Sequence, residues 1–137
     1  MTRSAYNGYL SKRTPEQRKA DLQLEATLAA QECIRKGITS FQDAGSSFDT
    51  IDLLREMYKD GKLDLRLWLM LRESNEQLKA RGAAYKFTGD QITVRAIKRQ
   101  IDGALGSRGA WLLAPYEDMP ASAGLNTESL EIGRAHV

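Results

Sequence analysis

The sequence predicts an α/β fold in which helices alternate with parallel strands. Two stretches carry apolar residues at helical spacing and a third predicts a shorter, polar helix, and each is followed by a stretch that predicts a strand. This alternation is typical of right-handed βαβ units. The 137 residues, 42% hydrophobic and 28% charged, have the size and composition of one globular domain.

The first helix has clear start and stop residues. Thr14 is suited to cap it, Pro15 to occupy its first position, and Gln17 to complete a capping box, while Gly37 ends it. The stretch from Ile38 to Gly45 then predicts a buried strand. The next helix is predicted to begin within 46–49 and to end at Gly61. An almost continuously apolar strand follows over 63–71, and we expect it to be covered on both faces. The remaining predicted elements are a polar helix over 74–82, a strand over 92–102, a turn or short helix over 111–116, and a helix beginning over 127–131.

Composition excludes several classes of protein. The net charge of +2 does not favour a nucleic-acid or membrane-surface partner, and no apolar run approaches the ~20 residues of a membrane span. Cys33 is the single cysteine, so no internal disulfide forms. With no leader visible in the first residues, we expect a cytoplasmic protein.

The single histidine, His136, lies in the closing stretch IGRAHV. This stretch back-translates to DNA that resembles a common sequencing adapter, so residues 132–137 are interpreted as an artefact and 14–131 as the domain, with 1–13 as a lead-in. Without His136, the chain by itself has no histidine for a catalytic triad or a metal ligand.

Lys98 is the first candidate functional residue. With a period of two, it shares a face of the predicted strand with Ile92, Val94 and Ala96, near the carboxyl end where parallel α/β proteins build their sites. Burial disfavours the charged form of a lysine, and a neutral amine can take up carbon dioxide to give a carbamate, an anionic metal ligand. The alternative is a lysine that reaches solvent or pairs with Asp102.

The loop GALGSRG follows this strand. Its spacing is neither a dinucleotide-binding fingerprint nor a P-loop. Its backbone amides, with Ser107 and Arg108, could hold an anion, and Arg108 could clamp a carboxylate. The alternative is a tight turn with a solvated arginine. Asp43, at the end of the first strand, is a candidate to contact substrate or to cap the following turn, and Trp68 and Trp111 are expected to pack.

Two segments resemble amidohydrolase family 3. VRAIKRQIDGALGSRGAWLLAPYEDMPASAGL, at 94–125, is similar to the family's V-K-x-x-x-D-G-A-L-G-S-R segment, and GITSFQDAG, at 37–45, is similar to its G-[IV]-T-x-x-x-D-A-G segment. They come in the family's order, and the resemblance covers about 14–125.

The resemblance implies a metal-dependent hydrolase on a (β/α)8 TIM barrel that cleaves C–N bonds in amides, formamides and related small molecules. It places Lys98, often carbamylated in the family, on the fourth barrel strand as a ligand of a divalent metal, most simply Zn²⁺. Asp102, Gly103, Ser107 and Arg108 then belong to the loop that lines the substrate pocket.

Part of the family's pattern is missing. A barrel needs ~250 residues, so we expect about three parallel βα units, barrel strands two to four, of an incomplete barrel. The His-x-His pair, the later histidines and the general base are absent, so the chain is expected to be inactive in isolation. The alternative function is a small non-catalytic α/β module that binds an anion at GALGSRG; a third is an interaction protein that uses an exposed sheet edge. The sequence does not predict an oligomeric state.

Overall fold

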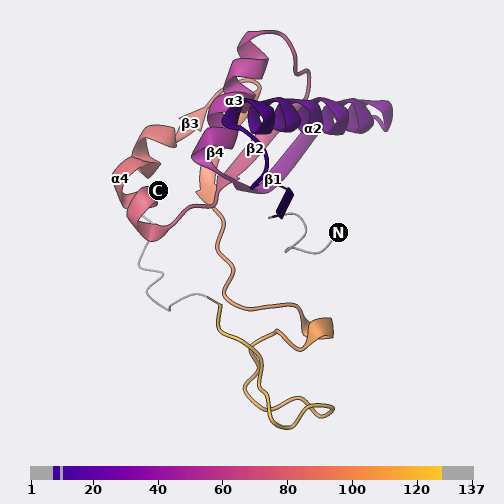
Figure 1. The fold of residues 1–137 in the computed structure, drawn as a ribbon, viewed down its shortest axis with the longest axis vertical. Coiled ribbons are helices and arrows are strands. Elements are labelled where there is room, and N and C mark those ends of the chain that lie inside the picture. The colour runs from indigo at the N-terminus through magenta and orange to yellow at the C-terminus, as the bar shows by residue number, and fades with distance from the viewer. Residues whose placement is uncertain (1–7, 10, 128–137) are drawn as a thin grey trace. The chain divides into compact units, whose positions relative to one another are not determined.

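The computed structural model describes residues 8, 9 and 11–127 and divides into two compact units, residues 1–96 and 97–137 (Figure 1). The elements in chain order are α2 (Pro15–Arg35), β1 (Ser40–Ser46), α3 (Phe48–Lys59), β2 (Arg66–Leu71), α4 (Asn75–Tyr85), β3 (Phe87–Thr88), β4 (Ile92–Ile97) and a short 3-10 helix, η1 (Leu105–Ser107). No helix in the described part of the chain is long and apolar enough to cross a membrane.

The strands form one four-stranded sheet in the order β1-β2-β4-β3. Strands β1 and β2 are parallel, with Phe41 opposite Leu67 and Asp43 opposite Leu69, and the register slips between Ala44 and Ser46. Helices α3 and α4 connect successive strands, as βαβ units require. This mixed, mostly parallel sheet confirms the predicted α/β class.

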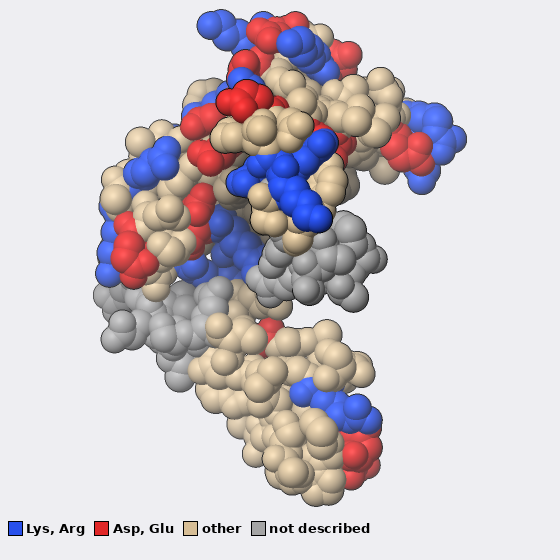
Figure 2. Space-filling model, in the orientation of Figure 1, with Lys and Arg blue, Asp and Glu red and all other residues tan. Residues whose placement is uncertain are grey.

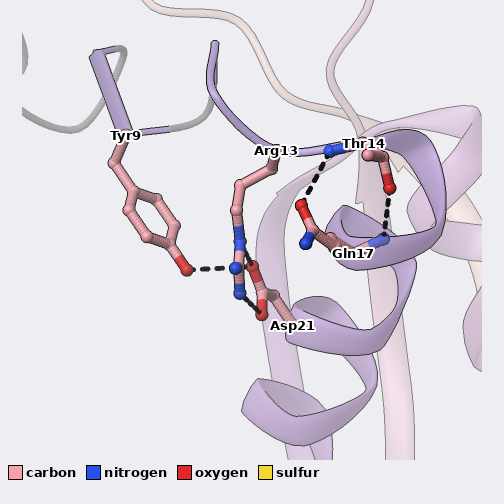
Figure 3. Close-up of polar contacts among 5 residues, drawn as sticks. All are labelled: Tyr9, Arg13, Thr14, Gln17 and Asp21. Atoms are coloured by element: carbon pink, nitrogen blue, oxygen red, sulfur yellow. Dashed lines mark hydrogen bonds and ion pairs between the residues drawn. The ribbon is translucent and has the colours of Figure 1, made fainter.

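The start of helix α2 follows the prediction from sequence. The Thr14 hydroxyl accepts the amide of Gln17, and the Gln17 side chain accepts the amide of Thr14, so the capping box is complete (Figure 3). Arg13 donates two hydrogen bonds to the Asp21 carboxylate, which also accepts the Tyr9 hydroxyl at 3.1 Å. These contacts tie the residues before the helix to its second turn.

The core of the first unit lies between α3 and one face of the sheet. Side chains of α3 and of alternate strand positions are buried; these are Phe48, Ile51, Leu53, Leu54, Met57, Leu67, Leu69, Leu71, Ile92 and Val94. The other positions of β2 are not buried, and Trp68 is 40% exposed. The expectation that this strand is covered on both faces is therefore wrong within the described residues, because its two faces differ in burial.

Several boundaries differ from the prediction. The second strand begins at Arg66 rather than at residue 63, and α4 continues past Gly82 to Tyr85. The Tyr85 ring packs 4.3 Å from the ring of Phe48, and its hydroxyl donates to Asp52 at 2.6 Å, so contacts with α3 extend the helix. Strand β3, only two residues long and antiparallel to β4, was not predicted.

The second unit is mostly irregular. Residues 111–116 form no helix; the chain turns there, with a bridge between Tyr116 and Met119. Thr127 donates its amide to the Ile101 carbonyl at 3.0 Å and its hydroxyl to the Gln100 carbonyl at 2.7 Å, so residues 100–127 form a closed lobe. Thr127 is not helical, and the rest of the predicted helix over 127–131, like the tail at 132–137, lies outside the described residues.

Candidate active site

Lys98 is the first residue after β4, which ends at Ile97. The prediction that this strand continues to Asp102 is wrong. The carbonyls of Gln100 and Ile101 accept hydrogen bonds from Thr127 of the lobe, so the chain leaves the sheet before these residues. Lys98 is half-buried at this exit and makes no ion pair or hydrogen bond with a described residue. The predicted alternative, a pair with Asp102, is not formed.

The Asp102 carboxylate forms a hydrogen bond across the glycine loop. Its Oδ2 accepts the backbone amide of Trp111 at 3.0 Å. This bond joins the residue before the glycine loop (Gly103–Gly109) to the second residue after it. Asp102 thus fixes where the chain runs on both sides of that loop.

The glycine loop is closed by contact between its first and last residues. The Gly103 amide donates to the Gly109 carbonyl at 2.9 Å, and the Gly109 amide donates to the Ala104 carbonyl at the same distance. A Cβ added to Gly103 would lie 2.9 Å from the Cα of Gly109, closer than real contacts allow. Gly106, in η1, has nothing within 4 Å of an added Cβ. The glycines at the two ends of the loop are therefore required by close approach of the backbone.

Ser107 and Arg108 use their polar groups within the lobe. The Ser107 hydroxyl donates to the Ala104 carbonyl at 3.2 Å. Arg108 has a left-handed backbone, with φ of 56°, and its Nε and Nη2 both donate to Asp118 Oδ2, at 3.1 and 2.7 Å. This pair is largely exposed, so its contribution to stability is small. The role of Arg108 as an anion clamp stays a prediction, and in this structure the guanidinium braces the loop.

Asp43 belongs to the first unit, on β1. Its Oδ2 accepts the hydroxyl of Ser46 at 2.6 Å, and Ser46 is buried. Ser47 then caps α3 through its side chain. The Glu73 carboxylate accepts the amide of Phe48 at 2.8 Å, so a residue just beyond β2 satisfies a second free amide at the start of α3. Asp43 here organises the turn between β1 and α3.

The donor set does not by itself fit a metal ion. Among residues 8, 9 and 11–127, no group of three or more His, Cys, Asp or Glu side chains is placed to hold one. Lys98 is the one position that the sequence motif associates with a metal, and a single ligand does not fix an ion.

Some residues that shape the site were not predicted from the sequence. Thr127 and Gly124 close the lobe: Gly124 has φ of 94°, and a Cβ there would lie 1.9 Å from the Ala110 carbonyl oxygen. The Tyr116 hydroxyl donates to that same carbonyl at 2.8 Å. Gly124 itself, which follows Pro115 and Pro120, was the available indication of a positive φ. No local sequence pattern indicates the hydrogen-bond partners of Thr127, Tyr116 and Arg108.

Comparison with known proteins supplies a family. The family model described as "Amidohydrolase family" matches residues 1–135. A search of curated proteins finds no match. Among solved structures, the chain is similar to an uncharacterized metal-dependent hydrolase from Pyrococcus furiosus, with a TM-score of 0.67 and 25% identity over 80% of this chain and 24% of that one.

A second similar structure is an uncharacterized metal-dependent hydrolase from Pyrococcus horikoshii OT3, with a TM-score of 0.67 and 24% identity over 80% of this chain and 23% of that one. The chain thus spans about a quarter of the length of these structures. The family model covers nearly every residue, including Lys98, Asp102 and the glycine loop. The chain belongs to the amidohydrolase family.

Proposed function

We propose that this chain is part of a metal-dependent hydrolase that cleaves C–N bonds other than peptide bonds in small molecules, such as amides and formamides. The observation that carries the proposal is the match of the family model over residues 1–135, which contain the segment from Lys98 to Arg108. The two Pyrococcus structures, described as metal-dependent hydrolases, support the metal dependence.

The architecture we propose is three βα units of a (β/α)8 barrel, with β1, β2 and β4 as barrel strands two, three and four. The parallel pairing of β1 with β2 and the intervening helices support this assignment. So does the agreement with about a quarter of each Pyrococcus chain. In a barrel of eight strands the outer edge of β1 would pair with a preceding strand, and neighbouring elements would cover side chains of β1 that are exposed here.

The metal we propose is Zn²⁺, with Lys98 in its carbamate form as one ligand. Because the residues that the structure describes do not by themselves fit a metal ion, the proposal requires further ligands from outside the described residues. Such a metal would supply an activated water and polarise the substrate carbonyl. This chain contributes Lys98 at the end of β4 and, through Asp102, the path of the loop that follows it.

The test uses the longer polypeptide that carries this sequence, expressed intact. We expect hydrolysis of at least one member of a panel of N-formyl and N-acyl amines, lost after chelation and restored by Zn²⁺ or another divalent ion. The 137-residue chain alone should turn over none of them. Absence of any metal-dependent turnover by the intact protein across the panel would refute the proposed function.

Lys98 gives a sharper test of the site. Lys98→Ala should lower activity and metal content together, and acetate at high concentration should restore part of both. Lys98→Arg should not restore them, because a guanidinium cannot take up carbon dioxide. Lys62→Arg is the matched control, since Lys62 is exposed and forms an ion pair with Asp60. Normal activity and metal content in Lys98→Arg would remove the carbamate assignment.

The alternative, an anion-binding module, has less support. The side chains of Ser107 and Arg108, which would hold the anion, are bonded to Ala104 and Asp118 within the lobe. Titration of the chain with inorganic phosphate, followed by backbone amide shifts of 103–109, tests this alternative. Saturable binding that Arg108→Gln abolishes would favour it.

A further inference from the structure

The backbone of Ala110 and of the two residues that follow it is held by contacts from several parts of the lobe. The Ala110 carbonyl accepts the Tyr116 hydroxyl, and the backbone of Gly124 lies against it. The Trp111 amide donates to Asp102, and the Leu112 amide donates to the Ala123 carbonyl at 2.8 Å. Three consecutive residues are thus fixed by separate parts of the lobe.

The side chain presented by this held backbone is an exposed indole. Trp111 remains 46% exposed among the described residues. On the face that Figure 2 shows, the lobe is mostly uncharged, with a basic patch beside an acidic one and a separate small acidic spot. An aromatic ring on a fixed backbone loses little conformational entropy on binding, which is why such residues serve as recognition elements. The arrangement favours an apolar ligand over a charged one.

The backbone of Trp111 is connected to the segment that carries Lys98 through Asp102. Asp102 follows Lys98 by four residues, and its carboxylate accepts the Trp111 amide. The contact between Gly103 and Gly109 brings the two sides of the glycine loop together. The segment that carries Lys98 therefore positions the backbone to which the Trp111 ring is attached. The sequence predicts only that the Trp111 side chain packs. Packing of the side chain does not require the hydrogen bond from the Trp111 amide to Asp102.

We propose that Trp111 recognises an apolar substituent of the substrate, an aryl or branched alkyl group attached to the amide, and that Asp102 is the residue that positions it. The inference rests on the proposed hydrolase function and names the substrate class of that same site. It assigns Trp111 to specificity and leaves the bond-breaking chemistry to the metal site.

The experiment compares two substrates of the intact protein that differ only in this group: an N-acyl amine with a phenyl substituent and the same compound with a methyl group in its place. In Trp111→Ala, kcat/KM for the phenyl substrate should fall about tenfold or more, and for the methyl substrate less than about twofold, because an apolar pocket discriminates by the surface it buries. Trp111→Phe should keep most of the preference. Leu113→Ala, a neighbouring side chain that is fully exposed, is the control and should keep the wild-type ratio.

Asp102 is tested by a matched pair of variants. Asp102→Ala removes the acceptor for the Trp111 amide and should lose the preference for the phenyl substrate, whereas Asp102→Asn keeps a side-chain oxygen and should retain much of it. If Trp111→Ala does not fold, the substrate ratios of Trp111→Phe and Trp111→Leu decide: the ratio should fall from Trp to Phe to Leu.

Two results would overturn the inference and are distinguishable. If wild-type protein hydrolyses both substrates but the Trp111 variants lower both equally, or neither, Trp111 has no role in specificity while the proposed function stands. If wild-type protein turns over no amide in a metal-dependent way, the proposed function fails and the inference fails with it.

Discussion

Gly103 and Gly109 are in direct backbone contact. The amide of Gly103 donates to the carbonyl of Gly109 at 2.9 Å, and a Cβ on Gly103 would lie 2.9–3.0 Å from three backbone atoms of Gly109. The contact closes the loop that follows Lys98 and brings Asp102 to within hydrogen-bond distance of the Trp111 amide.

Gly103→Ala should therefore destabilise the lobe by about 2 kcal/mol, because backbone must move to admit the methyl group. Gly106→Ala, with open space at its Cβ, should change stability by less than about 0.5 kcal/mol. Hydrogen exchange of the Gly109, Leu112 and Tyr116 amides measures both effects. Equal protection in the two variants would contradict the close contact.

Tyr58→Phe should stabilise the first unit. The Tyr58 hydroxyl is buried and has no hydrogen-bond partner among the described residues, and an unsatisfied buried polar group costs about 1 kcal/mol or more. We expect a melting temperature about 3 °C higher in the variant at neutral pH. A lower melting temperature would show that the hydroxyl has a partner.

The same tyrosine predicts a dependence on alkaline pH. Burial, with a smaller contribution from Asp64, raises the pKa of Tyr58 to about 12 from the ordinary 10.0. The folded state then holds its proton between these values while the unfolded state releases it, so this contribution to stability is complete below pH 10 and is lost as pH rises toward 12. Denaturant unfolding of wild type and Tyr58→Phe should give a stability difference that grows in favour of the variant across this window. A constant difference would contradict the raised pKa.

Thr14→Ala should lower stability by about 1 kcal/mol, because it removes the acceptor for the Gln17 amide at the start of α2. Thr14→Ser keeps the hydroxyl and is the matched control, with little expected change. Urea unfolding followed by circular dichroism measures both. An equal loss in the two variants would point to the threonine methyl group rather than the cap.

The lowered pKa of Asp21 predicts that the protein loses stability in acid. The hydrogen bonds from Arg13 hold the pKa of Asp21 below its ordinary value. The unfolded state therefore takes up a proton before the folded state does, so the contribution is present above the ordinary carboxyl pKa of about 4 and is lost as pH falls through the lower folded value. Asp21→Asn should show a shallower fall of melting temperature between about pH 5 and 2. Identical acid profiles would show that the contact with Arg13 does not persist in solution.

The sequence by itself determined the features that depend on neighbours in the chain. The ends of α2 follow from Thr14, Gln17 and Gly37, whose interactions span only a few residues. The α/β class follows from hydrophobic periodicity. The family follows from the motif that includes Lys98 and the glycine loop, in which particular residue types stand at fixed spacing. Each of these depends on residue types and spacing along the chain, with no knowledge of distant partners.

Only the tertiary structure decided where elements end when their partners are distant. Strand β4 ends at Ile97, and further along the Ile101 carbonyl bonds to Thr127, which is 26 residues beyond it in the sequence. Helix α4 continues past Gly82 because Tyr85 contacts α3. The period-two pattern could not show where pairing stops, because side chains alternate in an extended segment whether or not its backbone is in a sheet. The Asp102–Trp111 bond likewise depends on the path of the loop between them, which the contact of Gly103 with Gly109 sets.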